Sequence, residues 1–67
     1  MTLKNFLKLV RADELISLYD LAHNVYICQE KCKDDHDRQY DQCRVTGVNT
    51  NVTHDDYAIL EIDIWTL

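Results

Sequence analysis

The sequence predicts an α+β fold, in which a short N-terminal helix packs on a small antiparallel sheet of about four strands (α-β-β-loop-β-β). Three observations lead to this prediction: apolar residues at helical spacing in the first ten positions, β-branched and aromatic residues beside a His-Asn turn, and strict alternation in the C-terminal segment DDYAILEIDIW. A chain of 67 residues makes a single domain, residues 1–67, near the lower size limit for an unaided hydrophobic core.

The first element is an N-terminal helix of about two turns. The hydroxyl of Thr2 can accept a hydrogen bond from the first turn and so cap the helix. Four apolar residues follow the i, i+3, i+4, i+7 rule that places them on one face: Leu3, Phe6, Leu7 and Val10.

The next segment, ELISLYDL, fits either a helix or a short buried strand. The strand is favoured because β-branched and aromatic residues follow in HNVYIC, directly after a His-Asn turn. We therefore expect a hairpin with strands near residues 14–20 and 25–30.

Residues 31–41 are too polar for a core and predict a loop or a short solvated helix. A third strand is expected at residues 43–48 and a fourth at 57–65. The chain has no proline and one glycine, Gly47, so Asn and Asp must form the turns. This places the connections at residues 20–24, 33–37 and 49–56.

The last strand has two different sides when it is read with period two. We predict that the inner side, formed by Ala58, Leu60, Ile62 and Ile64, faces the core. The outer side carries Tyr57, Ile59, Glu61, Asp63 and Trp65. It is either a solvated face or a partner-binding face, because aromatic residues mixed with fixed charges are typical of interaction surfaces. The expected partner-binding residues are Asp55, Asp56, Tyr57, Glu61, Asp63 and Trp65.

The charge limits the class of partner. The net charge is −5, and no lysine or arginine follows Arg44. Such a chain repels nucleic acids and anionic membranes and favours a protein with a basic surface. No apolar run is long enough for a membrane span or a signal-peptide core, and three cysteines suit reduced thiols, so we expect a cytoplasmic protein.

Metal and catalytic sites are not expected. Cys28, Cys32, His36 and Cys43 offer the donors of a zinc site, but their spacing lacks the tight CxxC-type turns of zinc modules. Asp34, Asp35, Asp37 and Asp41 lack the periodicity and glycine of a calcium loop. No nucleophile-bearing turn or oxyanion-hole glycine occurs, so the prediction is a non-enzymatic protein without a cofactor. A zinc-stabilised interaction module stays open as an alternative.

Four segments carry a resemblance to a known group of proteins: TLKNFLKLV, ELISLYDLAHNVYI, CRVTGV and DDYAILEIDIW. In order and length they resemble small uncharacterised proteins encoded by phages and prophages of Gram-positive bacteria. The resemblance implies an inhibitor that binds a host factor or a defence complex in the host cytoplasm. It transfers no catalytic residue.

The function predicted from these features is inhibition by occupation of a basic surface, for example on a CRISPR effector. An alternative is a homo-oligomeric sponge that sequesters a signalling nucleotide between subunits. For that role the bases that lie near one another in sequence are Lys31, Lys33, Arg38 and Arg44.

Overall fold

The computed structural model describes residues 1–52 and 55–67. It contains one short α-helix, two 3-10 turns and four strands. Their bounds are α1 Leu3–Leu7, β1 Leu15–Asp20, β2 Val25–Cys32, η1 Lys33–Asp35, η2 Arg38–Tyr40, β3 Arg44–Val52 and β4 Ala58–Trp65. The predicted α+β class and the order of its elements are confirmed.

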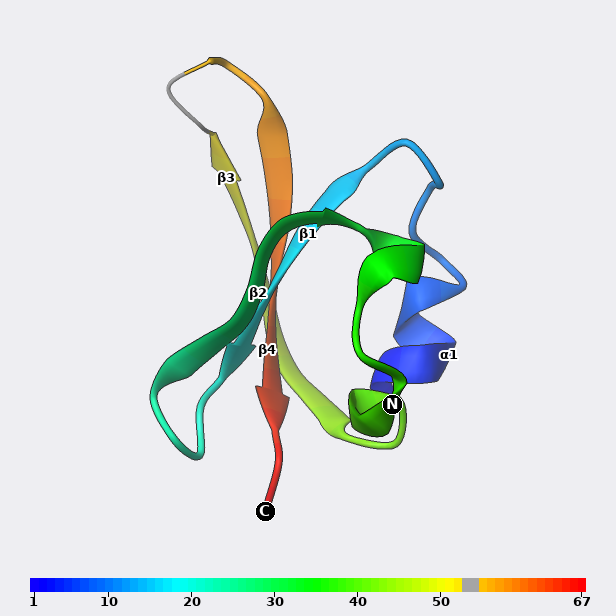
Figure 1. The fold of residues 1–67 in the computed structure, drawn as a ribbon, viewed down its shortest axis with the longest axis vertical. Helices are drawn as coiled ribbons and strands as arrows, with labels where there is room; N and C mark the ends of the chain where they lie inside the picture. Colours follow the sequence, from blue (N-terminus) through cyan, green and yellow to red (C-terminus); the bar gives the residue numbers. More distant parts are fainter. Residues whose placement is uncertain (53–54) are drawn as a thin grey trace.

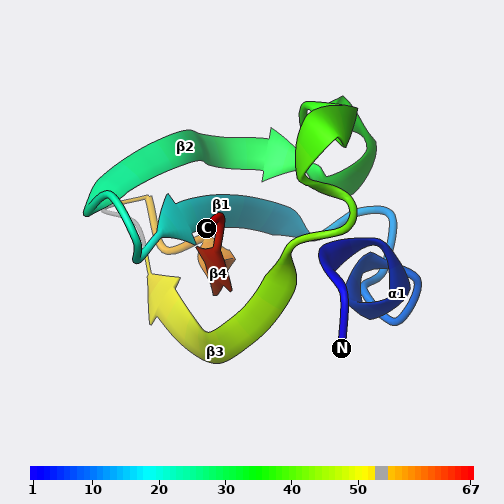
Figure 2. The ribbon, with the colours of Figure 1, turned by 90° about the horizontal axis from the view of Figure 1, so that it is seen from below.

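The four strands form one sheet in the order β2-β1-β4-β3, which can be followed from top to bottom in Figure 2. The pairs β1–β2 and β3–β4 are antiparallel, but β1 and β4 run parallel, so the sheet is mixed and not antiparallel as expected. The chain therefore places its last strand in the middle of the sheet, between the first and third strands.

Helix α1 and the connection from residue 33 to residue 43 lie on one side of the sheet (Figure 1). Thr2 caps the helix as predicted, because its Oγ1 accepts a hydrogen bond from the Asn5 amide at 3.3 Å. At the other end, Lys33 Nζ donates to the carbonyls of Leu7 and Val10 at 3.0 and 2.6 Å. This ammonium group satisfies the Val10 carbonyl and joins the Val10 amide as a second donor to the Leu7 carbonyl, at the C-terminal end of the helix, where the dipole is negative.

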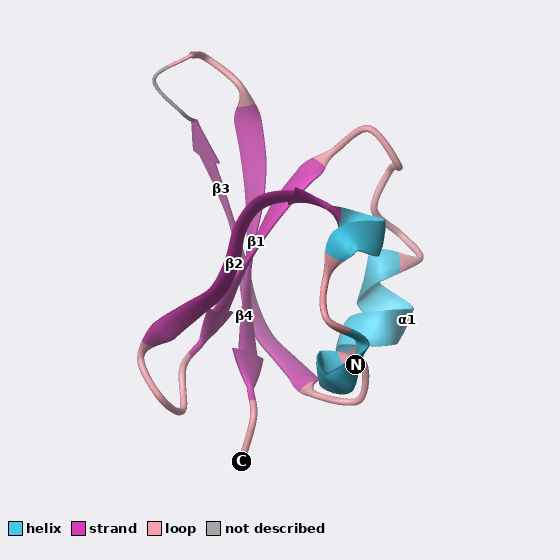
Figure 3. Cartoon of the chain, in the orientation of Figure 1, coloured by secondary structure: helices cyan, strands magenta, loops and turns pink. Residues whose placement is uncertain are grey.

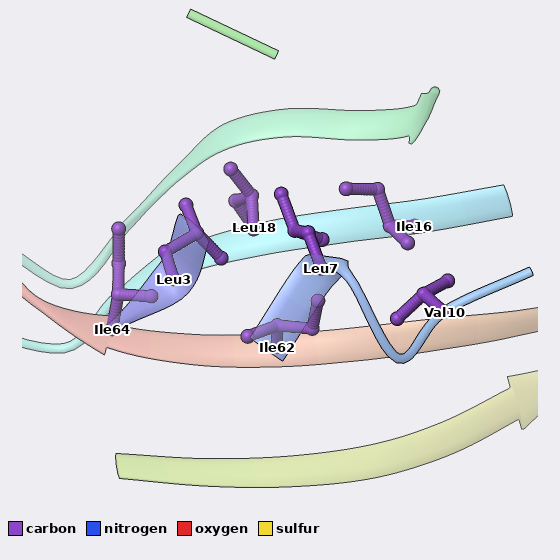
Figure 4. Packing of buried hydrophobic residues seen from close by; sticks show 7 residues of the cluster. All are labelled: Leu3, Leu7, Val10, Ile16, Leu18, Ile62 and Ile64. Carbon is purple, nitrogen blue, oxygen red and sulfur yellow. The ribbon is translucent and has the colours of Figure 1, made fainter. Parts of the chain in front are cut away.

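The core fills the space between this layer and the sheet (Figure 4). Its buried members come from the N-terminal segment, β1 and β4: Leu3, Leu7, Val10, Ile16, Leu18, Ile62 and Ile64. Full burial of a leucine or isoleucine side chain stabilises a fold by about 1.5–3 kcal/mol, so these seven residues hold the two layers together.

The predicted inner side of β4 is confirmed for Ile62 and Ile64, and Leu60 packs partly buried against the same core. Ala58 is exposed, because the β3–β4 hairpin extends beyond the helical layer at this end (Figure 1). Ile59 was expected on the open side but is only 7% exposed. It lies in a central strand, and its register partners Leu15 and Asn51 flank it.

Strand β3 is longer than predicted. The sequence predicts a connection at residues 49–52, but these residues pair with β4 as far as Val52 opposite Ala58. Their valine and threonine side chains suit a strand, and pairing with a long partner outweighs the turn preference of asparagine. The remainder of the expected 49–56 connection includes residues 53–54, which lie outside the described residues.

Candidate functional site

The side of the sheet away from α1 carries a cluster that we call the acidic face, formed by Tyr19, Tyr26, Asn51, Glu61 and Asp63. Glu61 and Asp63 alternate along β4 with the buried Ile62 and Ile64, so their side chains leave the sheet on the opposite side from the core. The helical elements do not cover this side (Figure 3).

Glu61 has polar neighbours on both adjoining sides of the sheet. Asn51 Nδ2 on β3 donates to Glu61 Oε2 at 2.7 Å. From β2, the Tyr26 side chain approaches the same carboxylate across β1, where the small Ser17 is the register partner of Glu61. Burial and this contact with Glu61 raise the pKa of Tyr26 above its ordinary value of 10.0. The phenol therefore stays protonated and remains a donor at neutral pH.

Two tyrosine rings border the carboxylates. Tyr19 and Tyr26 are opposite each other in the β1–β2 register. Their ring centroids lie 4.9 Å apart with an interplanar angle of 80°, which is a favourable edge-to-face contact. The contact thus orients the two rings relative to each other beside the acids.

Asp63 differs from Glu61. Among residues 1–52 and 55–67, no side chain makes a hydrogen bond or ion pair with its carboxylate. Burial raises the pKa of Asp63 above its ordinary value of 3.8, and the charge of Glu61 raises it further. Within the described residues, the fold therefore holds a partly buried acid without a cation, next to a second acid. A cation from another molecule would relieve this unfavourable arrangement.

The six expected partner-binding residues do not form one patch. Glu61, Asp63 and Trp65 share the open side of β4, with Trp65 40% exposed opposite Arg44. Asp55, Asp56 and Tyr57 precede β4 at the tip of the β3–β4 hairpin. Tyr57 and Trp65 are eight positions apart in extended chain, about 26 Å at the usual rise per residue.

Sequence reasoning missed Tyr19, Tyr26 and Asn51 as members of the site. A usable signal was present in the predicted hairpin, where Tyr19 and Tyr26 come close to the turn on facing strands. The sequence predicts a connection around Asn51, so the position of this residue beside Glu61 could not be inferred.

A second feature lies on the helical side. A hollow of about 160 Å³, which we call the basic hollow, is lined by Lys4, Leu7, Lys8, Lys33, Asp34, His36, Arg38 and Asp41. Four of the chain's seven lysine and arginine residues are in this lining. In the described part of the chain, no carboxylate forms an ion pair with Lys4, Lys8 or Arg38. These clustered bases thus lie on the opposite side of the sheet from Glu61 and Asp63.

The structure does not bring together the three cysteines and His36, which could supply the donors of a zinc site. His36 is buried, and its Nδ1 and Nε2 face the Lys33 carbonyl at 2.7 Å and Asp41 Oδ1 at 2.6 Å. Both ring nitrogens are therefore occupied. Within the described ranges, no three His, Cys, Asp or Glu residues are close enough together to hold a metal ion.

The cysteines and aspartates are also placed unfavourably for chemistry. Burial raises the pKa of Cys43 above its ordinary value of 9.0, with a smaller contribution from Asp20, so this thiol is a poor nucleophile at neutral pH. Of the aspartates considered for calcium, Asp41 is engaged by His36 and Asp37 by Gln39.

No helix in the part of the chain that the structure describes is long and apolar enough to cross a membrane. Comparison of the chain with protein-family models, curated proteins and solved structures finds no match.

Proposed function

We propose that this chain is a non-enzymatic binding protein whose acidic face occupies a basic surface of a partner protein. The observation that carries the proposal is the Asp63 carboxylate, which is partly buried, lies beside Glu61 and has no cationic partner among the described residues. Such a group reduces the stability of the free protein and gains most from an arginine or lysine supplied by another molecule.

Recognition would combine charge with rigid apolar contacts. An arginine guanidinium of the partner donates to the Asp63 carboxylate, and Glu61, held by Asn51, receives a second cation. The edge-to-face pair of Tyr19 and Tyr26 offers aromatic surface for the partner's side chains. This mode of action needs no bond-making step and no cofactor.

The partner class that suits this face is a bacterial host or defence protein that itself binds nucleic acid, because such proteins expose clustered lysine and arginine. A CRISPR effector with its positively charged channel is one example. In this proposal the protein is phage-derived, acts in the host cytoplasm and inhibits by occupying the basic surface.

The test uses an oligoarginine peptide as a defined probe at low ionic strength, with binding followed by NMR amide shifts and calorimetry. We expect saturable shifts around Glu61, Asp63 and Tyr26, and an affinity that falls as salt is added. The variant Asp63→Asn should weaken binding several-fold.

The matched control is Asp34→Asn, which removes the same charge from an exposed residue of the basic hollow. It should retain nearly wild-type affinity. Equal losses in both variants would mean that net charge alone attracts the peptide, and the assignment to the acidic face would then be wrong.

A second candidate function rests on the basic hollow. Three bases without an ion-pair partner in the described ranges surround a space of about 160 Å³, which suits a compact anion such as a phosphate group. This observation favours the nucleotide-sponge alternative. Of the four bases that lie near one another in sequence, Lys33 and Arg38 line the hollow, whereas Lys31 and Arg44 do not. The other two bases of the lining are Lys4 and Lys8.

Thermal unfolding with inorganic phosphate and with cyclic dinucleotides tests this candidate. A ligand present at 100 times its dissociation constant stabilises the native state by about 2.7 kcal/mol, which raises the melting temperature clearly. The variant Lys8→Gln should lose this ligand-induced rise in melting temperature, whereas Lys31→Gln should keep it. Absence of any shift in the wild-type protein would remove the candidate.

A further inference from the structure

The two edges of the sheet are protected to different degrees. Edge strand β2 has irregular pairing with β1, carries the charged Glu30 and Lys31, and holds Glu30 at a φ of 53°. Bulges and charges of this kind discourage pairing with another chain. At the other edge, the first residues of β3 are covered, because Met1 and Leu3 form backbone hydrogen bonds with Val45 and Cys43.

Beyond Val45 the outer edge of β3 is open. In the described part of the chain, β4 is the only strand beside residues 47–52 of β3. This stretch, GVNTNV, contains no charged residue and no proline. Val48 and Val52 are 41% and 70% exposed. An uncharged, extended edge with exposed β-branched residues is a template for strand addition.

The sequence of this edge indicates its occupant. Residues 48–52 read Val-Asn-Thr-Asn-Val, which is the same in both directions about Thr50. Two copies of such a strand, paired antiparallel about a twofold axis at Thr50, place Val48 opposite Val52 and Asn49 opposite Asn51 of the second copy. Like residues therefore meet at every position, which is the self-complementarity that an isologous interface requires.

We propose that two copies of this chain dimerise through their β3 edges, with Thr50 on the twofold axis and residues 48–52 in register. Backbone hydrogen bonds join the two sheets into one sheet of eight strands, and the paired valines lose exposed apolar surface. The absence of charge in this strand matters, because each chain has a net charge of −5 and like charges directly opposite would oppose pairing.

The arrangement has a consequence for the acidic face. A twofold axis that relates antiparallel neighbours is perpendicular to the sheet, so the open sides of both copies face the same way. The dimer would present two acidic faces on one surface, and an extended basic partner could engage both with increased avidity. The dimer itself rests on the edge geometry and the sequence symmetry, and does not depend on the proposed partner binding.

The test compares two double variants by native mass spectrometry and by light scattering across a concentration series. In Val48→Lys/Val52→Lys, equal charges stand opposite each other at two places in the dimer. In Val48→Lys/Val52→Glu, opposite charges stand at the same two places. We expect a dimer for the wild type and for the Lys/Glu variant, and a dissociation constant about tenfold or more higher for the Lys/Lys variant.

Far-UV circular dichroism and melting curves establish that both variants fold. A matched control, Gln29→Lys, places a charge on the exposed part of edge strand β2 and should leave the dimer intact. Because the chains carry like net charge, added salt should strengthen the wild-type dimer, whereas it weakens oligoarginine binding. A wild-type monomer at high micromolar concentration, or equal dimerisation of the two double variants, would overturn the proposal.

Discussion

Asp63 on β4 is the register partner of Gly47 on the neighbouring strand β3, and Gly47 is the only glycine of the chain. A Cβ atom on Gly47 would come within 3.2 Å of Asp63 Oδ2, so the missing side chain gives the carboxylate its room. The backbone of Gly47 does not need a positive φ. The glycine therefore serves the position of this acid and not a turn.

The first prediction concerns Gly47→Ala. The stability of this variant should stay within about 0.5 kcal/mol of wild type, because removing a glycine from a strand gains about 0.5–1 kcal/mol and displacing the carboxylate opposes that gain. Binding of oligoarginine should weaken, since Asp63 must rotate away. Urea unfolding and calorimetry measure the two effects. In an Asp63→Asn background the same alanine should change binding no further, and an additive loss would contradict this explanation.

The second prediction is that Asp63→Asn stabilises the free protein at neutral pH. The folded state raises the pKa of the Asp63 carboxyl, so the ionised form is disfavoured in the folded protein. Its unfavourable contribution to stability therefore grows as the pH rises from the pKa of the unfolded state through that of the folded state. Since Asp63 is partly exposed, solvent screening limits the gain to about 0.5 kcal/mol. Urea unfolding at neutral and acidic pH tests this, and the difference between variant and wild type should shrink at low pH.

A gain in stability together with a loss of peptide binding would indicate that Asp63 serves binding at a cost to folding. The control Asp35→Asn changes an exposed carboxylate outside the acidic face, and it should alter neither property. If Asp63→Asn instead destabilises the protein at neutral pH, the carboxylate has a structural role and the second prediction is wrong.

The elements of this fold could be predicted from the sequence because their signals are local. The cap at Thr2, the helical spacing of Leu3 and Leu7, and the alternation of Ile62 and Ile64 all act within a few residues. The parallel pairing of β1 with β4 could not, because it joins segments more than 40 residues apart and no turn fixes it. The central position of β4 follows from that pairing.

The candidate site was predicted only in part for the same reason. Glu61 and Asp63 share a side by simple alternation, so one strand was enough to pair them. Tyr26 reaches Glu61 across an intervening strand, and the β1–β2 register shifts on both sides of Leu18. Alternation alone gives the wrong side after such a shift, so the aromatic half of the site required the structure.

The third prediction concerns the contact between Lys33 and α1. Replacement by methionine keeps the apolar stem but removes the ammonium that donates to the Leu7 and Val10 carbonyls. We expect a loss of about 1–2 kcal/mol in the free energy of unfolding, on the scale of charged hydrogen bonds at a helix end. Urea unfolding measures it. The exposed Lys31→Met should change stability by less than about 0.5 kcal/mol, and equal effects of the two substitutions would exclude a specific role for Lys33.

The last prediction concerns the pH dependence that Asp20 introduces at the start of the β1–β2 turn. Its side chain accepts hydrogen bonds from Thr66 Oγ1 at 2.8 Å, His23 Nδ1 at 2.7 Å and the Ala22 amide at 3.0 Å. Burial opposes ionisation, but these hydrogen bonds together outweigh it and hold the pKa of Asp20 below its ordinary value of 3.8. The carboxylate thus joins Thr66, which follows β4, to the β1–β2 hairpin.

The pKa of Asp20 is lower in the folded state than in the unfolded state. Its contribution to stability is therefore fully present above the unfolded-state pKa near 3.8 and is lost as the pH falls through the folded-state pKa. Asp20→Asn should therefore lower the melting temperature at pH 7, and its difference from wild type should narrow below pH 3.8. Thr66→Val removes one donor and should show a smaller change of the same sign. Melting curves from neutral to acidic pH measure both, and a pH-independent difference between Asp20→Asn and wild type would show that the carboxylate's charge is not what stabilises the turn.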